Sequence, residues 1–231
     1  MIQTSKQAKA FQEKAIQSQM NPHFIFNVLA SFQTMILSLN VEKANQYLVK
    51  LAALVRGFLD ASTENGKTNH IEESWHPVQK EIELIEGFVD FQELIYPGKF
   101  NFILKIAEEI NVENETIPPM ILQPFIENAI RHGLLPKNFP GNLWLQFDRI
   151  GYKGILISIE DDGIGIEKAG KILNDSPFRY ESKGSMLTLN RIKLMNELGY
   201  QITVKTHSSE KGTIINIRIP KNDKGNKSNH R

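Results

Sequence analysis

Cysteine is absent from the 231-residue chain, which excludes disulfides, thiolate metal sites and cysteine nucleophiles. An excess of charge of either sign is also missing, because 27 Lys and Arg residues face 26 Asp and Glu residues. A nearly neutral chain gives no global argument for binding nucleic acid or an anionic membrane. We therefore expect no direct nucleic-acid partner and, from the missing cysteines, a reducing compartment.

Long apolar runs are missing as well. The first twenty residues are polar and lack the apolar core of a signal peptide. A stretch such as Ile155–Ile159, interrupted by Ser158, falls far short of the ~20 residues that span a bilayer. The chain as given is predicted to be soluble. Because it starts inside a helix-like pattern, it is also a candidate fragment of a longer protein.

What is present suffices for a core, since 41% of the residues are hydrophobic and 23% are charged. In the N-terminal quarter, a mostly apolar seam alternates steps of four and three, which is helical spacing. A break near residues 39–41 predicts an antiparallel hairpin, and burying both seams predicts a dimeric four-helix bundle. The seam positions are Phe11, Ala15, Ser18, Pro22, Ile25, Leu29, Phe32, Ile36, Leu39, Ala44, Leu48, Leu51, Val55 and Phe58.

The rest of the chain mixes helical and strand patterns without a regular βαβ alternation, which predicts an α+β class. A polar linker over 63–77 separates the two parts. The predicted domains are a hairpin at 1–68, a second domain at 69–222 and a polar tail at 223–231. Helices are expected at 81–95, 118–134, 167–173 and 186–198, and strands at 100–106, 143–150, 154–160, 201–206 and 213–219.

The segment Asn-Pro-His-Phe-Ile-Phe-Asn at residues 21–27 places a proline inside a helical pattern, beside His23. Proline removes one backbone hydrogen bond and bends the helix. An imidazole at the edge of the bundle reaches solvent, where it is able to act as a nucleophile. The alternative is a kinked helix with an incidental histidine, and local features alone favour that alternative.

Four polar groups lie close together in the helical pattern at 123–133. Asn128 offers a neutral oxygen suited to Mg²⁺. Arg131 or His132 suits phosphate charge, and Glu127 suits a proton or a water molecule. An ordinary polar helix face that ends at Gly133 explains the same residues, so both interpretations stay open.

Two glycine-containing turns complete the motifs. Asp161, which follows an apolar strand, is placed to accept a hydrogen bond from an exocyclic amine such as that of adenine, and Gly163 and Gly165 allow close backbone approach. Near Gly184, a turn that opens a helix would present N–H groups to phosphate. A plain Asp-Gly turn and a helix cap formed by Ser185 are the structural alternatives.

The four motifs, in this order and over about residues 17–220, resemble the LytS-like sensor histidine kinases. Residues 21–27 resemble the phosphoacceptor motif of that family, 123–133 its N box, 161–165 its G1 box, and 182–192 its G2 region. The resemblance implies a Bergerat ATP-binding domain, an α/β sandwich with a mixed sheet and a flexible lid. It also implies ATP and Mg²⁺ as cofactors, a response-regulator partner and a homodimer.

The resemblance assigns roles to individual residues. His23 would receive the γ-phosphoryl group, Asn128 would ligate Mg²⁺, and Glu127 holds the position of a general base in related ATPases. Arg131 and His132 would face the phosphates. Asp161 would bind the adenine amine with help from Thr213, and Gly163, Gly165 and Gly184 would admit the nucleotide. Phe24 departs from the acidic residue common after the phosphoacceptor, and the G2 region lacks a run of glycines.

Three functions compete at this stage. The first is an ATP-dependent protein histidine kinase that passes phosphate to a response regulator, in the cytoplasmic part of a bacterial inner-membrane sensor that is anchored through a missing upstream segment. The second is a degenerate ATP-binding or scaffolding module, which the altered G2 region suggests. The third is a water-activating ATPase that uses Glu127 and leaves the Asn-Pro-His motif unexplained.

Overall fold

A computed structural model describes residues 49–50, 52, 56–57, 75–152, 154–169 and 183–220. Most of the hairpin predicted at 1–68 lies outside the described residues, as do His23, the lid region before Gly184 and the tail. The predicted four-helix bundle and the domain limits therefore stay predictions.

The described core is built on a five-stranded sheet in the order β2-β4-β5-β7-β6. β2 and β4 run parallel, and the other neighbours are antiparallel. This mixed sheet, together with its helices, confirms the predicted α+β class. The strands are β2 (Phe100–Ile106), β4 (Gly141–Arg149), β5 (Gly154–Asp161), β6 (Thr203–Ser209) and β7 (Gly212–Pro220).

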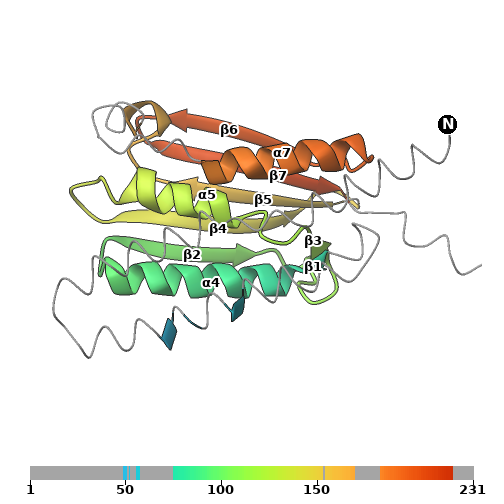
Figure 1. Cartoon of the computed structure of the whole chain (residues 1–231), viewed down its shortest axis with the longest axis horizontal. Helices are drawn as coiled ribbons and strands as arrows, with labels where there is room; N and C mark the ends of the chain where they lie inside the picture. The colour runs from blue at the N-terminus through green and yellow to red at the C-terminus, as the bar shows by residue number, and fades with distance from the viewer. Residues whose placement is uncertain are drawn as a thin grey trace, which may run out of the picture.

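The helices are α4 (Val78–Ile95), α5 (Gln123–Asn128) with the wider π turn η3 (Ala129–Leu134), and α7 (Lys183–Glu197). In Figure 1, α4 lies beside β2, α5 in front of β4 and β5, and α7 in front of β6 and β7. The sheet presents alternate residues to this helical layer, which is the period of a strand with one buried face.

Register explains where the core lies. Phe147, Ile157 and Ile217 are neighbours across β4, β5 and β7, and all three are buried. One residue along each strand, Ser158 and Asn216 point to the opposite face and form a hydrogen bond of 2.8 Å. The hydrophobic core therefore lies between the sheet and the helices, while the other sheet face is polar at its centre.

The helix predicted at 118–134 begins five residues late, at Gln123. The consecutive prolines at 118–119 keep the first of them out of helical conformation, and Met120 follows with a left-handed φ of 56°. Instead, the two-residue strand β3 (Thr116–Ile117) pairs with β1 (His76–Pro77), the segment that enters α4. No sequence period predicts strands this short.

Helical residues near position 50 lie along α4. The Lys50 ammonium forms an ion pair of 3.5 Å with the Asp90 carboxylate. A Cβ added to Gly57 would lie 3.1 Å from a methyl group of Leu84. Among the described helices, none combines the length and apolar character that crossing a membrane requires.

The core position of Phe147 gives a stability prediction. Phe147→Ala removes a fully buried ring from the centre of β4 and should lower the free energy of unfolding by about 3–5 kcal/mol. Tyr152→Ala is the control, because Tyr152 is 97% exposed and its loss should change stability by about 0.5 kcal/mol or less. Urea unfolding measures both. Equal effects of the two substitutions would contradict the assigned register.

Candidate functional site

Asp161 ends β5 at a buried point of the sheet. It is 5% exposed, and its register partners are Leu143 on β4 and Thr213 on β7. Its carboxylate oxygen Oδ1 accepts a hydrogen bond of 2.9 Å from the Gly163 N–H. The strand therefore delivers an acidic side chain to a dry position, and the next turn folds back to bind it.

Two glycines make room for this carboxylate. A Cβ on Gly163 would lie 2.4 Å from Asp161 Oδ1, and a Cβ on Gly133 would lie 2.7 Å from the same atom. A real Cβ atom essentially never lies this close to another heavy atom, so a side chain at either position would displace the carboxylate. The Ile164 N–H donates to the Gly133 carbonyl at 3.1 Å. The predicted N box and G1 box thus meet at Asp161.

The β6–β7 hairpin holds the other side of the turn. Gly165 has φ +76°, and a Cβ there would lie 2.1 Å from the Ser209 carbonyl oxygen. The Ile166 N–H donates to Ser208 Oγ at 2.9 Å, and Ser208 Oγ lies 3.1 Å from Thr213 Oγ1. Thr213, singled out in the sequence, is therefore next to Asp161. Ser208 had no sequence signal.

Burial raises the pKa of Asp161 to about 6. The neighbouring Asp162 raises this pKa further, whereas hydrogen bonds from Gly163 and Thr213 and the charge of Lys137 lower it. Above that pH the group is an acceptor-only carboxylate in a poorly hydrated position. Such a carboxylate discriminates strongly in favour of a ligand that donates a hydrogen bond.

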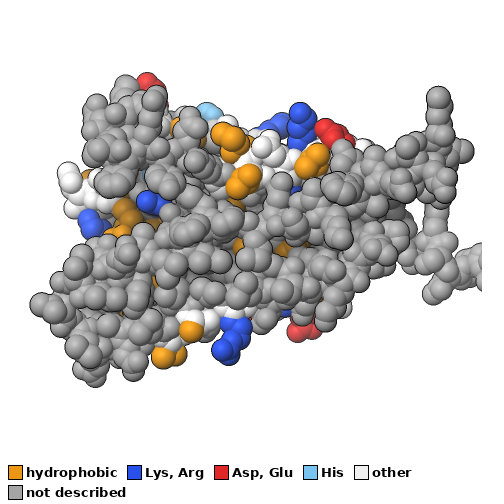
Figure 2. All heavy atoms as spheres, in the orientation of Figure 1, with side chains coloured by type: hydrophobic (Ala, Val, Ile, Leu, Met, Phe, Trp, Pro, Cys, Tyr) orange, Lys and Arg blue, Asp and Glu red, His pale blue; other side chains and the backbone are white. Residues whose placement is uncertain are grey.

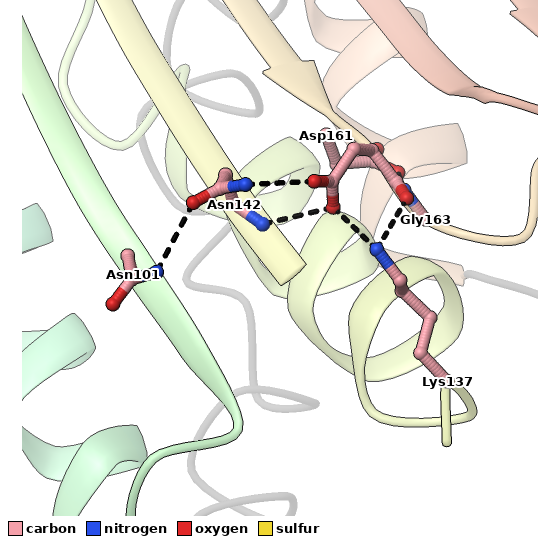
Figure 3. A network of polar contacts seen from close by, with 6 residues as sticks. Asn101, Lys137, Asn142, Asp161 and Gly163 are labelled. Carbon is pink, nitrogen blue, oxygen red and sulfur yellow. Dashed lines mark hydrogen bonds and ion pairs between the residues drawn. The ribbon is translucent and has the colours of Figure 1, made fainter. Parts of the chain in front are cut away.

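Asp162 has the opposite environment. It accepts from Lys137 Nζ at 2.7 Å and from the backbone and side-chain nitrogens of Asn142, each at 2.8 Å. Although burial raises the pKa of Asp162, these donors outweigh it and hold the pKa below its ordinary value. Asn101 on β2 donates in turn to Asn142 Oδ1 at 3.1 Å. Figure 3 shows Lys137 and Asn142 pointing toward the turn that carries Asp161 and Gly163.

Asn128 ends α5, where its side chain contacts α7. Its Nδ2 donates to Ser185 Oγ at 3.1 Å, which leaves the amide oxygen as the atom suited to a cation. The helix containing Ser185 begins at Lys183, so Ser185 lies in its first turn and is not the cap residue that one sequence interpretation assigned to it. Gly184 is the preceding residue, and the N box and the start of α7 are thus adjacent.

The remaining N-box residues differ in exposure. Glu127 Oε1 lies 4.0 Å from Arg131 Nη1, with side chains 10% and 46% exposed, respectively. Both Arg131 and the half-buried His132 lie on the π turn η3. Arg131 has the exposure that contact with a charged ligand requires, whereas Glu127 is largely enclosed. Figure 2 shows the exterior of the molecule, in which basic side chains are scattered over the visible described surface.

The donor set limits how a metal would bind. In the ranges that the structure describes, no cluster of three or more His, Cys, Asp or Glu side chains could hold an ion. Mg²⁺ commonly binds proteins through one or two oxygen ligands, with substrate phosphates and water completing its shell. The single amide oxygen of Asn128 fits that mode. His23 lies outside the described residues, so its relation to this site stays a prediction.

Comparison with known proteins decides the family. The profile described as histidine kinase matches residues 11–100, and that described as histidine kinase-, DNA gyrase B-, and HSP90-like ATPase matches residues 114–223. The chain belongs to the histidine kinases. The second match implies that the C-terminal part of this histidine kinase uses ATP.

Individual relatives agree with this assignment. Sensor protein LytS of Staphylococcus saprophyticus is 29% identical over 210 residues, covering 90% of this histidine kinase and 33% of the relative. Sensor histidine kinase/phosphatase LytS of Staphylococcus aureus is 26% identical over 218 residues, covering 94% and 35%. The histidine kinase thus spans about a third of the length of these curated relatives.

A solved structure supports the fold. The histidine kinase domain of a blue-light activated histidine kinase from Erythrobacter litoralis superposes with a TM-score of 0.51 at 15% identity, covering 94% of each chain. At that identity the likeness concerns the fold alone.

The opposite environments of the two aspartates predict opposite pH behaviour. Because the folded pKa of Asp161 exceeds its unfolded value, the stabilisation that protonated Asp161 contributes to the wild type is lost as the pH rises from about 4 to 6. Asp161→Asn removes this loss, so its unfolding free energy relative to wild type should rise by about 3 kcal/mol between pH 4 and 8. Urea unfolding at several pH values measures this.

Asp162→Asn is the matched control. The folded pKa of Asp162 is lowered, so its stabilisation is complete above about pH 4 and fades only below it. Asp162→Asn also removes a charge that raises the pKa of Asp161, so its difference from wild type should change over the same pH range, but by much less than that of Asp161→Asn. A constant difference for Asp161→Asn would contradict the raised pKa of Asp161.

Proposed function

We propose that this histidine kinase transfers the γ-phosphoryl group of ATP to His23 and then to an aspartate of a response regulator. The observation that carries the nucleotide half of the proposal is the buried Asp161 carboxylate, which two glycines and the β6–β7 hairpin enclose. The Asn-Pro-His motif at 21–23 supports His23 as the acceptor.

The adenine end of the nucleotide would lie at Asp161. Its carboxylate accepts a hydrogen bond from the exocyclic amine, and Thr213, on the neighbouring strand, assists through water. Gly163 and Gly165 let the turn pack against the Asp161 carboxylate and the Ser209 carbonyl, where a Cβ would clash, and this turn would bring its backbone to the base. Guanine presents a carbonyl oxygen instead of the amine, so the site would select adenine.

The phosphate end would lie between the N box and the start of α7. Asn128 offers its amide oxygen to Mg²⁺, which when bound neutralises phosphate charge. Arg131 and His132 on η3 face the phosphates, and Gly184 allows backbone N–H groups near the start of α7 to approach them. Glu127, the candidate general base, is largely enclosed and near Arg131, an arrangement that favours orientation of the site over activation of bulk water.

The proposed phosphoryl transfer to His23 is a direct displacement, in which one bond to phosphorus forms and another breaks. The unprotonated imidazole nitrogen of His23 forms a bond to the γ-phosphorus, and the bond to the β–γ bridging oxygen breaks, so that ADP leaves. The other ring nitrogen then loses its proton to solvent or to Glu127. In the second step, a response-regulator carboxylate displaces the imidazole from phosphorus.

The proposed assembly is a homodimer through the hairpin, working on the cytoplasmic side, where ATP is available.

The acceptor is tested with γ-labelled ATP and the 231-residue chain. Wild type should incorporate acid-labile, alkali-stable phosphate, and His23→Gln should incorporate none, because the nucleophile is lost. Binding of a non-hydrolysable ATP analogue by calorimetry is the control and should be the same for both proteins. Label that persists in His23→Gln would rule out His23. Phosphate release without any phosphoprotein would favour a water-activating ATPase, and failure to bind the analogue would favour a degenerate module.

The metal role of Asn128 is tested separately. Asn128→Ala should weaken binding of a non-hydrolysable ATP analogue in Mg²⁺ by about tenfold or more, as expected for a lost contact to a charged group. In EDTA its affinity should match that of wild type. Asn101→Ala is the control, since Asn101 is an exposed amide on β2 that donates to Asn142. An equal loss with and without Mg²⁺ would assign Asn128 a structural role.

A further inference from the structure

Glu81, in the first turn of α4, is a carboxylate outside the proposed nucleotide site and is 0% exposed. A buried carboxylate is strongly destabilising unless donors satisfy it. Glu81 therefore marks a position where the fold brings several donors together, although none of the sequence motifs includes it.

Three hydrogen bonds converge on this carboxylate. Oε2 accepts from His76 Nε2 at 2.8 Å and from the Met120 N–H at 2.8 Å. Oε1 accepts from the Leu122 N–H at 3.0 Å. A fourth partner acts through charge, because burial lowers the pKa of Arg191 on α7 to about 10 while the negative charge of Glu81 raises it. The carboxylate thus joins β1 to the segment before α5, and its charge acts on Arg191 of α7.

The two backbone donors, Met120 and Leu122, lie directly before the N box. Leu122 is the N-cap residue of α5, and its own side chain makes no capping hydrogen bond. The first N–H groups of a helix lack partners within the helix, and a negative charge beside them is stabilising. Met120, two residues earlier, has the left-handed φ of 56° that is unfavourable for a residue with a side chain. Glu81 supplies the acceptor that both N–H groups require.

We propose that Glu81 is a positioning residue of the nucleotide site, which fixes the start of α5 and through that helix places Asn128. The inference rests on the proposed function only in taking Asn128 to be a nucleotide-site residue. α5 and η3 are continuous, so a shift at Leu122 is passed to the side chains of the N box. The side chain of Asn128 is itself held by the hydrogen bond to Ser185.

The hydrogen bonds of Glu81 also reach β1, the segment that leads into α4. His76 lies on β1, and the Val78 N–H that follows donates to the Glu115 carbonyl at 2.8 Å, just before β3. Trp75 packs against Tyr200, which lies beyond α7, with ring centroids 5.4 Å apart. The entry segment and the start of the N box therefore share one carboxylate, so the placement of each depends on the other.

Glu81→Gln tests the proposal, with Glu83→Gln as its matched control on the same helix. Glutamine keeps the size of the side chain but replaces one acceptor oxygen by an NH₂ group, which cannot accept from a backbone N–H. Glu83 is exposed and accepts a hydrogen bond from Gln79 on the same helix. Both variants are made in the 231-residue chain.

Amide hydrogen exchange without nucleotide is the first readout. In wild type, the Met120 and Leu122 amides should be protected. In Glu81→Gln at least one of these two amides should exchange about tenfold faster, because the loss of a capping hydrogen bond costs enough free energy to open the segment that much more often. Glu83→Gln should exchange like wild type. Exposed-like exchange of both amides in wild type would overturn the proposal, even if Glu81→Gln fails to fold.

Autophosphorylation kinetics are the second readout. Glu81→Gln should raise the KM for ATP about fivefold or more, with kcat at saturating ATP within about twofold of wild type, because bound nucleotide restores the competent position. Partial unfolding would instead lower kcat at unchanged KM, and that result would overturn the proposal. If wild type itself fails to bind or use ATP, the proposed function is wrong, while the exchange measurement still tests the hold of Glu81 on α5.

Discussion

The site depends on keeping one carboxylate, that of Asp161, in a nearly dry position. Burial of a charge is unfavourable unless donors surround it, and here the Gly163 N–H is one such donor. The space exists only because residues 133 and 163 have no side chains. The junction of β5, η3 and the β6–β7 hairpin is therefore built around this group. The same enclosure would make the site selective for a ligand that carries an amine.

The adjacent aspartates show how environment separates two chemically identical groups. Burial leaves Asp161 with a raised pKa, whereas Lys137 and Asn142 satisfy Asp162 and lower its pKa. Asp162 thereby braces β4 and the loop after the N box against the turn. Glu81, which is buried, does the same before the start of α5, so a carboxylate holds each end of the segment that carries Asn128.

Sequence periodicity predicted the main sheet and its helices, because strands such as β4 and β5 alternate buried and exposed residues and α4 and α7 carry apolar faces. It placed the start of α5 wrongly, since prolines suit both a first helical turn and an extended segment. The family resemblance, rather than any motif around Thr213, placed Asp161 and Thr213 in one site. Lys137, Asn142 and Glu81 were missed, and Ser185 was considered only as a helix cap, because a polar contact between distant segments leaves no period or motif. The role of His23 stays a prediction.

The central claim is that Asp161 recognises the exocyclic amine of adenine. The direct measurement is calorimetric binding of non-hydrolysable ATP and GTP analogues to wild type and to Asp161→Asn, in Mg²⁺ above pH 7. Wild type should bind the ATP analogue at least about tenfold more tightly than the GTP analogue, and Asp161→Asn should lose most of this preference. Equal affinity of wild type for the two analogues, or an unchanged preference in Asp161→Asn, would contradict it.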